Sequence, residues 1–210
     1  MNTIGVVNLK GGTGKTTVAL HLAAYYAHRG GVTVVHDLDR QKCATTWIER
    51  RDPRLPAIQA VARKADPPDA RTVIVDAPAG TRSDALEALV KFAQVILVPV
   101  LPSALDEVGT ARFLTLLAEL PRVRRHRVRI GLVANRWRSR SAPSNQLGAF
   151  LAACGFPVVA HLRDSPLYAT SAGTGRAVFE LPTTRARALG SDWLPLFSWL
   201  DEGFSNSPPG

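Results

Sequence analysis

The sequence lacks the features that mark several broad classes of protein. It has only two cysteines in 210 residues, Cys43 and Cys154, which lie far apart and in no metal-ligand spacing. A disulfide scaffold and a zinc ribbon are therefore poor interpretations, and we expect a reducing compartment. No apolar run approaches the roughly 18 residues that span a bilayer, and the N-terminus has no signal-peptide pattern. Hydrophobic residues make up 46% and charged residues 20% of the chain, which is typical of a globular domain.

Acidic residues are scarce in one third of the chain. Residues 121–190 contain twelve arginines, no lysine and two acids, Asp164 and Glu180. Residues 1–120 are nearly neutral, with 14 basic and 12 acidic residues, and residues 191–210 hold three acids and no base. Arginine-rich codon usage would explain the choice of arginine over lysine, but it does not explain the missing acids. The net charge of +9 is therefore concentrated in one region, which favours a polyanionic partner.

Apolar, β-branched runs alternate with helical patterns along the chain. We predict strands at residues 3–8, 32–36, 71–75, 95–100, 129–134 and 157–160, with a short edge strand at 57–61 in the proline-containing connection 53–68. Strands that are apolar throughout and separated by helices indicate an α/β fold with a mostly parallel, twisted sheet and helices on both faces. We expect one domain over residues 1–204 and a polar tail at 205–210.

A glycine-rich loop lies between the first predicted strand and the first predicted helix. Its glycines allow backbone N–H groups to turn toward phosphate oxygens, and the following helix presents its positive N-terminal end. Lys15 is placed to reach the β- and γ-phosphates of a nucleotide and the Thr16 hydroxyl to ligate Mg²⁺. A strict Walker pattern would have glycine where Leu9 stands. The predicted nucleotide-binding residues of the loop are Lys10, Gly11, Gly12, Thr13, Gly14, Lys15, Thr16 and Thr17.

The loop sequence KGGTGKTT resembles the deviant Walker A motif of the ParA/MinD family of P-loop ATPases. The resemblance implies the P-loop NTPase fold with ATP and Mg²⁺ as ligands. It also implies that the chain forms a homodimer when ATP is bound, in which Lys10 reaches across to the phosphates held by the partner. A second cation at that point would offset charge on the phosphate oxygens as the bond breaks.

Two acidic motifs fit the same family in order and spacing. Residues 36–41, HDLDRQ, resemble its DxDPQ element, with Arg40 in place of the usual proline. By this resemblance Asp39 would position the attacking water and hold Mg²⁺ through water, with Asp37 nearby. Residues 73–80, VIVDAPAG, have the Walker B layout, in which Asp76 would contact Mg²⁺ through water. The resemblance thus gives Lys10, Lys15 and Asp39 catalytic roles, and it assigns the metal site to Thr16, Asp37, Asp39 and Asp76.

Three later segments extend the resemblance from residue 2 to about residue 180. Residues 98–106, VPVLPSALD, resemble the VPVxPSxLD segment of the family. Asn135 follows the next predicted strand, at the position where relatives read the edge of adenine with an amide. The segment 163–180, which begins with Arg163, resembles the late element that lines the adenine pocket.

Few residues precede the phosphate loop, and in this respect the chain resembles the short ParA proteins. We therefore expect no helix-turn-helix before Thr3. The resemblance implies an ATPase with weak intrinsic activity that binds DNA non-specifically and positions a plasmid, a chromosome region or a protein cargo over the nucleoid. A ParB-like protein or cargo adaptor would stimulate hydrolysis. We therefore expect a cytoplasmic, nucleoid-associated protein with no stable membrane binding.

The arginines of the basic region are the candidates for contact with DNA. No aromatic residues are interleaved with the group at 122–129 and no recognition-helix pattern occurs, so we predict contact with phosphates rather than with bases. We also predict that this group and the group at 136–140 lie at opposite ends of the sheet, with the second nearer the nucleotide. The candidates are Arg122, Arg124, Arg125, Arg127, Arg136, Arg138, Arg140, Arg163, Arg185 and Arg187.

Alternative functions remain open at this point. A MinD-like protein would bind membranes through a C-terminal helix, and Trp193, Leu196, Phe197 and Leu200 form a helical stripe. Pro195 is expected to interrupt that stripe, and the acidic segment has the wrong sign for anionic lipid, so packing on the core is favoured. A metabolic P-loop enzyme would need a further catalytic constellation, and none is visible. The positions of Cys43 and Cys154 do not match those that hold the cluster in iron-protein relatives. A module that binds ATP without hydrolysing it is a further open alternative.

Overall fold

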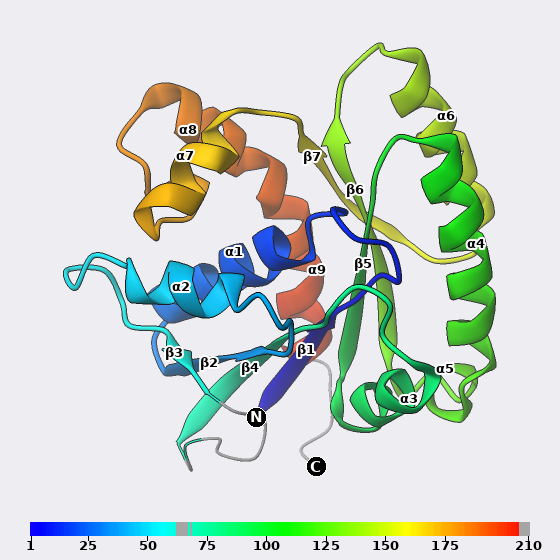
Figure 1. The fold of residues 1–210 in the computed structure, drawn as a ribbon, viewed down its shortest axis with the longest axis horizontal. Coiled ribbons are helices and arrows are strands. Elements are labelled where there is room, and N and C mark those ends of the chain that lie inside the picture. Colours follow the sequence, from blue (N-terminus) through cyan, green and yellow to red (C-terminus); the bar gives the residue numbers. More distant parts are fainter. Residues whose placement is uncertain (62–66, 68, 206–210) are drawn as a thin grey trace.

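A computed structural model describes residues 1–61, 67 and 69–205 of the chain. Its centre is a seven-stranded sheet in the order β3-β2-β4-β1-β5-β6-β7, and every pairing is parallel (Figure 1). The α/β fold with a parallel sheet is therefore confirmed. The strands are β1 (Asn2–Val6), β2 (Val32–Asp37), β3 (Gln59–Ala60), β4 (Ala70–Asp76), β5 (Val95–Val100), β6 (Arg129–Trp137) and β7 (Val158–Arg163).

Helices cover both faces of the sheet, as Figure 1 shows. Most strands are followed by a helix that leads to the next strand, which is how parallel neighbours are joined. One face carries α3 (Ser83–Phe92), α4 (Ala104–Glu119), α5 (Pro121–Arg124) and α6 (Ala142–Ala153). The other carries α1 (Lys15–His28), α2 (Cys43–Glu49), α7 (Leu167–Thr174), α8 (Thr184–Gly190) and α9 (Leu194–Ser205), with the 3₁₀ turns η1 (Val178–Glu180) and η2 (Ser191–Trp193).

The strands are buried as their sequences predict. All six residues of β5 are buried, since helices cover the sheet on both sides at its centre. The expected strand at residues 57–61 is confirmed as an edge strand but is only Gln59–Ala60.

The carboxyl ends of three strands differ from the prediction by two or more residues, and β1 stops at Val6 rather than at the predicted residue 8. Strand β6 continues beyond the predicted residue 134 to Trp137, and β7 continues beyond 160 to Arg163. The two strands pair at Trp137 and Arg163 after a register shift, and Arg136 has a φ of 50°. Apolar periodicity ends at Ala134, so this polar and irregular extension leaves no strand signal in the sequence.

The last helix packs on the core, as the sequence favoured. Leu196, Phe197 and Leu200 are buried, and the Phe197 ring stacks on Tyr25 of α1 at 3.8 Å between centroids. Pro195 does not interrupt this helix: it lies in the first turn, where its missing N–H costs no hydrogen bond. Within the described parts of the chain, no helix is both long and apolar enough to cross a membrane. Helix α9 ends at Ser205, and the rest of the expected polar tail lies outside the described residues.

Candidate functional site

The predicted motifs meet at the carboxyl edge of the sheet. The glycine-rich loop follows β1, the HDLDRQ segment ends β2, and Asp76 ends β4. The register places Asp76 beside Val6 on one side and beside Asp37 on the other. Parallel strands deliver their ends to one edge, which is where open α/β sheets bind ligands. Segments that are 60 residues apart in the chain, such as those of Thr16 and Asp76, therefore form one site.

The loop has the backbone that phosphate binding requires. Gly12 and Gly14 have φ values of 77° and 93°, in the left-handed region that favours glycine. A Cβ on Gly14 would lie 2.2 Å from Nδ2 of Asn135, so no larger residue fits there. Helix α1 begins at the next residue, Lys15, and its N-terminal N–H groups point into the loop.

The two lysines of the loop have different environments. Lys15 is buried, and its ammonium group donates to the Lys10 carbonyl oxygen at 2.9 Å. Burial lowers the pKa of Lys15, although the charges of Asp76 and Asp39 act in the opposite direction. The Lys10 side chain is 43% exposed, and its Nζ lies 2.7 Å from Oδ2 of Asp106, which is only 4% exposed. One lysine thus faces into the loop and the other lies on its rim.

Thr16 and Asp76 form a pair that fits Mg²⁺. The Thr16 hydroxyl donates to Oδ2 of Asp76 at 2.7 Å, while Oδ1 of Asp76 is buried without a hydrogen bond. Burial raises the pKa of Asp76 to about 7, with the Thr16 hydrogen bond acting against the shift. A cation would satisfy the orphaned oxygen and restore the charged carboxylate. Among the described residues, no three His, Cys, Asp or Glu side chains are grouped to hold a metal. Mg²⁺ bound beside Thr16 and Asp76 would take its other ligands from phosphate and water oxygens, as is usual for this ion.

Asp37 and Asp39 lie at this site in different roles. Oδ2 of Asp37 accepts from the backbone N–H and the hydroxyl of Thr45, at 2.9 and 3.0 Å, and Oδ1 accepts from the Asp39 N–H. Both oxygens therefore hold the turn that leads into α2. Asp39 is half-buried and lines a cavity of 710 Å³ between its own loop and residues 77–82. Asp39 is thus the more available acid for a water or a cation.

Asn135 lies directly against the phosphate loop. Its Nδ2 donates to the Thr13 carbonyl at 2.7 Å, and its Oδ1 accepts from the Arg136 N–H at 2.9 Å. In this arrangement the amide holds the loop that follows β1 to the end of β6. Its predicted contact with adenine remains a prediction.

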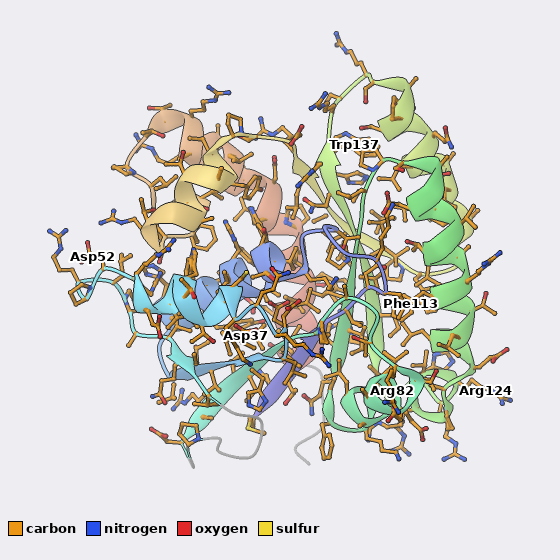
Figure 2. The ribbon with its side chains drawn as sticks, in the orientation of Figure 1. Asp37, Asp52, Arg82, Phe113, Arg124 and Trp137 are labelled. Carbon is orange, nitrogen blue, oxygen red and sulfur yellow. The ribbon has the colours of Figure 1, made fainter. Side chains whose placement is uncertain are left out.

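The candidate arginines separate into two groups, as predicted. Helix α5 and the turn before β6 hold the first group at the amino end of that strand, and Arg136 lies near its carboxyl end. Figure 2 shows Arg124 and Trp137 at opposite ends of this layer. The first group is Arg122, Arg124, Arg125 and Arg127, and the second is Arg136, Arg138 and Arg140. The further candidates are Arg163 at the end of β7 and Arg185 and Arg187 on α8.

Two of these candidate arginines already have carboxylate partners. Arg138 donates to Asp164 through Nε at 2.9 Å, and Arg163 donates to Asp192 through Nε at 2.8 Å. Arg163 also donates to the Ala188 carbonyl, which ties the end of β7 to α8. The Arg163 side chain therefore has a structural role beside the nucleotide or DNA contacts predicted for it. Arg136, Arg140, Arg185 and Arg187 are exposed.

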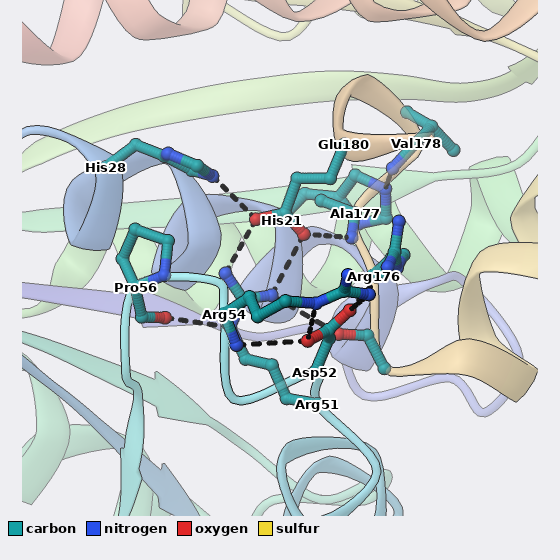
Figure 3. A network of polar contacts seen from close by, with 11 residues as sticks. His21, His28, Arg51, Asp52, Arg54, Pro56, Arg176, Ala177, Val178 and Glu180 are labelled. Atoms are coloured by element: carbon teal, nitrogen blue, oxygen red, sulfur yellow. Dashed lines mark hydrogen bonds and ion pairs between the residues drawn. The ribbon is translucent and has the colours of Figure 1, made fainter. Parts of the chain in front are cut away.

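A polar network behind the loop was missed by sequence reasoning. Arg51 makes two hydrogen bonds to Glu180, at 2.9 and 2.6 Å, and both side chains are almost fully buried (Figure 3). Burial alone would raise the pKa of Glu180, but the hydrogen bonds from Arg51 and from the Ala177 N–H lower it. His21 accepts from the Val178 N–H through Nε2, at 3.0 Å. These pairs are separated by 129 and 157 positions, so no local pattern in the sequence signals their contact.

Comparisons with known proteins agree with this geometry. Residues 4–178 match the protein family described as the CobQ/CobB/MinD/ParA nucleotide binding domain. The chain is 29% identical over 192 residues to a maintenance of carboxysome distribution protein A from Halothiobacillus neapolitanus, covering 85% of this chain and 87% of that protein.

Two solved structures share the fold. The ATP complex of a Cyanothece McdA variant matches with a TM-score of 0.77 at 17% identity, over 100% of this chain and 98% of the other. The cell division protein complex MinC:MinD of Aquifex aeolicus includes a chain that matches with a TM-score of 0.73 at 15% identity, over 100% and 98%.

Proposed function

The chain belongs to the CobQ/CobB/MinD/ParA nucleotide-binding family, and from this membership we propose that it is a positioning ATPase of the ParA type. It binds ATP, dimerises in the ATP-bound state, contacts DNA without sequence preference and hydrolyses ATP slowly until a partner stimulates it. The relative in Halothiobacillus neapolitanus is named for carboxysome distribution, which supports a protein cargo. ATP binding, dimerisation and hydrolysis would be the same if the cargo were a plasmid or a chromosome region.

The observation that carries this proposal is the pair of lysines on one loop. The buried Lys15 serves the phosphates bound by its own chain. Lys10, on the exposed rim, is free to turn outward once it leaves Asp106. Phosphate binding by one chain needs a single lysine, so a second, half-exposed lysine on the rim supports a site completed by two chains.

The remaining chemistry follows from the carboxyl edge of the sheet. Thr16, Asp76 and Asp39 would hold Mg²⁺, the two acids through water, and the ion would neutralise charge on the phosphates. Asp39 orients the attacking water beside residues 77–82, and Lys10 and Lys15 stabilise charge on the leaving oxygens. Asp37 supports this site by fixing the turn that carries Asp39.

The arginines near the nucleotide edge are the better candidates for DNA binding that depends on ATP. Arg136, Arg138 and Arg140 lie at the same end of β6 as Asn135, which contacts the phosphate loop. Dimerisation would place two copies of this set on one assembly and double the phosphate contacts. The group on α5 lies at the far end of β6, away from the nucleotide edge.

The alternatives gain no support from the structure. The apolar stripe of α9 is buried against α1, which leaves it unavailable to a membrane in the MinD manner. Among the described residues, no second catalytic constellation accompanies the loop. As part of this proposal, the protein acts in the cytoplasm on the nucleoid.

The proposal is tested by the binding of a labelled random-sequence DNA duplex, measured by fluorescence anisotropy with ATP, with ADP and without nucleotide. We expect tight binding with ATP alone. The double variant R138A/R140A removes four arginines from the dimer, so it should weaken binding at least about tenfold and reduce the slope of log affinity against log salt by up to about four.

The matched control is R124A/R125A, which removes the same charge from the far end of β6. We expect it to bind DNA as the parent does. Equal binding in all three nucleotide states would refute the ATP switch, and a loss confined to R124A/R125A would move the DNA surface to the other end of the sheet.

A further inference from the structure

A long groove lies between α4 and α6, on the face of the sheet opposite the phosphate-loop helix. A cavity of 610 Å³ between the two helices forms its upper part. A cavity of 470 Å³ forms its lower part, which runs past α5 to the amino end of β6, where Trp199 of α9 also lines it. The two cavities share Ala118, Arg124 and Phe156, so they are continuous. Neither includes a residue assigned above to nucleotide binding.

The floor of the groove is apolar. Phe150 and Phe156 are half-buried and pack on the buried core, and Ala111 and Ala153 are exposed on the walls. Val108, which is 56% exposed, lies one helical turn before Ala111 on the same face of α4 and extends this surface upward. Soluble proteins rarely expose a continuous apolar strip without a partner for it.

The lower end of the groove is cationic. Arg124 is exposed and lines both cavities, whereas Glu119 is the acid among the lining residues. Arg129 also lines the lower cavity, but its guanidinium donates to the Trp199 carbonyl at 2.7 Å and stacks on the Trp199 ring. Arg125 and Arg127 are exposed on the adjoining turn. An occupant with apolar side chains on one face and carboxylates toward α5 would match both the floor and the rim.

We propose that this groove binds an acidic, amphipathic helical segment of a partner protein. Apolar side chains spaced three and four residues apart would lie along α4 and α6, and glutamate or aspartate side chains would pair with Arg124 and its neighbours. DNA has no apolar face to cover Phe150 and Phe156. A second copy that packs through the same groove would offer only Glu119 as an acid among the lining residues, whereas an acidic segment supplies several carboxylates to Arg124 and its neighbours.

This surface is separate from the nucleotide site, so binding there needs neither ATP nor dimerisation. Peptide binding in the groove can therefore be absent while the proposed ATPase function holds, and the groove can bind a peptide even if that function is wrong. A partner held here would leave the phosphate loop and residues 77–82 uncovered.

The test uses a fluorescein-labelled 18-residue peptide of leucine and glutamate, with leucine at positions that form one helical face. Its scrambled form, which has the same composition without the apolar face, is the control. Anisotropy with nucleotide-free protein should show saturable binding of the amphipathic peptide, weakened by added salt because charges contribute. The scrambled peptide should bind at least about tenfold more weakly.

Two variants locate the site. R124E reverses the charge at the junction of the two cavities, and A111E introduces a carboxylate on the exposed wall. Each should weaken peptide binding about tenfold. R185E makes the same charge change on α8, on the other face of the sheet, and should bind as the parent does.

Equal weakening by R185E would reduce the effect to net charge and overturn the assignment. Equal affinity for the two peptides, or no binding of either, would also overturn it. DNA binding by nucleotide-free protein that R124E abolishes would assign the cations to nucleic acid instead. Self-association that A111E abolishes would assign the groove to a second copy of the chain.

Discussion

At the scale of single residues, the ion pair of Lys10 with Asp106 determines where the rim lysine points. The Nζ–Oδ2 distance is 2.7 Å, and the carboxylate is buried while the lysine is half exposed. Lys10 must leave this partner before it can reach phosphates across a dimer. The pair therefore stabilises the form of the site that is not engaged with a second chain.

We predict that D106N strengthens ATP-dependent self-association. Asparagine keeps the shape of the side chain but removes its charge. A partly exposed ion pair contributes up to about 1 kcal/mol, and each chain of the dimer releases one, so association should strengthen by up to roughly thirtyfold. Sedimentation velocity with ATP and Mg²⁺ would measure the change, with E107Q on the neighbouring residue as the control. Unchanged or weaker association in D106N would contradict this role for the pair.

At the scale of secondary-structure elements, His21 joins α1 to η1. Its Nδ1 lies 2.7 Å from the Thr17 carbonyl oxygen, which can only accept, so Nδ1 carries the proton. Its Nε2 accepts from the Val178 N–H, so the ring is neutral. The ring also stacks on Trp193 at 4.5 Å between centroids. One side chain therefore links the end of the phosphate-loop motif to two later turns.

The buried His21 gives stability a predicted pH dependence. Burial lowers its pKa to about 4, from an ordinary value of 6.5. Below pH 6.5 the unfolded chain binds a proton at this position and the folded chain does not, so stability falls as the pH falls toward 4. The loss amounts to roughly 3 kcal/mol.

Urea unfolding at several pH values measures this dependence. We expect H21Q to be less stable than the parent at pH 7 and to have a flatter profile between pH 6.5 and 4, whereas H126Q, at an exposed turn, should keep the parental profile. If H21Q and the parent lose stability in parallel, the acid sensitivity comes from other groups.

The same scale shows why part of the fold could be predicted and part could not. Buried parallel strands such as β5 have a continuous apolar sequence, and the glycine-rich loop has a local signature, so both were predicted from neighbouring residues. The extension of β6 through Asn135 and Arg136 is set by pairing with β7 after a register shift. Polar side chains in that extension give no strand signal, and the prediction stopped too early.

For the candidate site, the residues that belong to local motifs could be predicted, but their partners from distant segments could not. Thr16 and Asp76 were assigned from separate motifs, and the sheet brings their side-chain oxygens to 2.7 Å. The partner of Lys10 was not predicted, because Asp106 was identified only as part of a resembling segment. The pairing of Arg51 with Glu180 depends on how α2 and η1 meet in space, which no spacing in the sequence encodes.

At the scale of the whole molecule, positively charged side chains are concentrated at two separate ends of the sheet. The lysines of the loop lie at the carboxyl edge with the acids of the site, and the nearby arginines are our candidates for DNA. The cluster on α5 lies at the other end, beside an apolar groove. The net charge of +9 is thus distributed over surfaces with different proposed partners.

The central claim is that Lys15 binds phosphate within its own chain while Lys10 acts across a dimer. The most direct measurement is the mass of the parent and of K10A by sedimentation velocity with ATP and Mg²⁺, together with their rates of ATP hydrolysis. The parent should increase in mass on ATP addition. K10A should still bind ATP but show neither the ATP-dependent increase nor the parental rate. A K10A protein that dimerises with ATP and hydrolyses it at the parental rate would contradict the account.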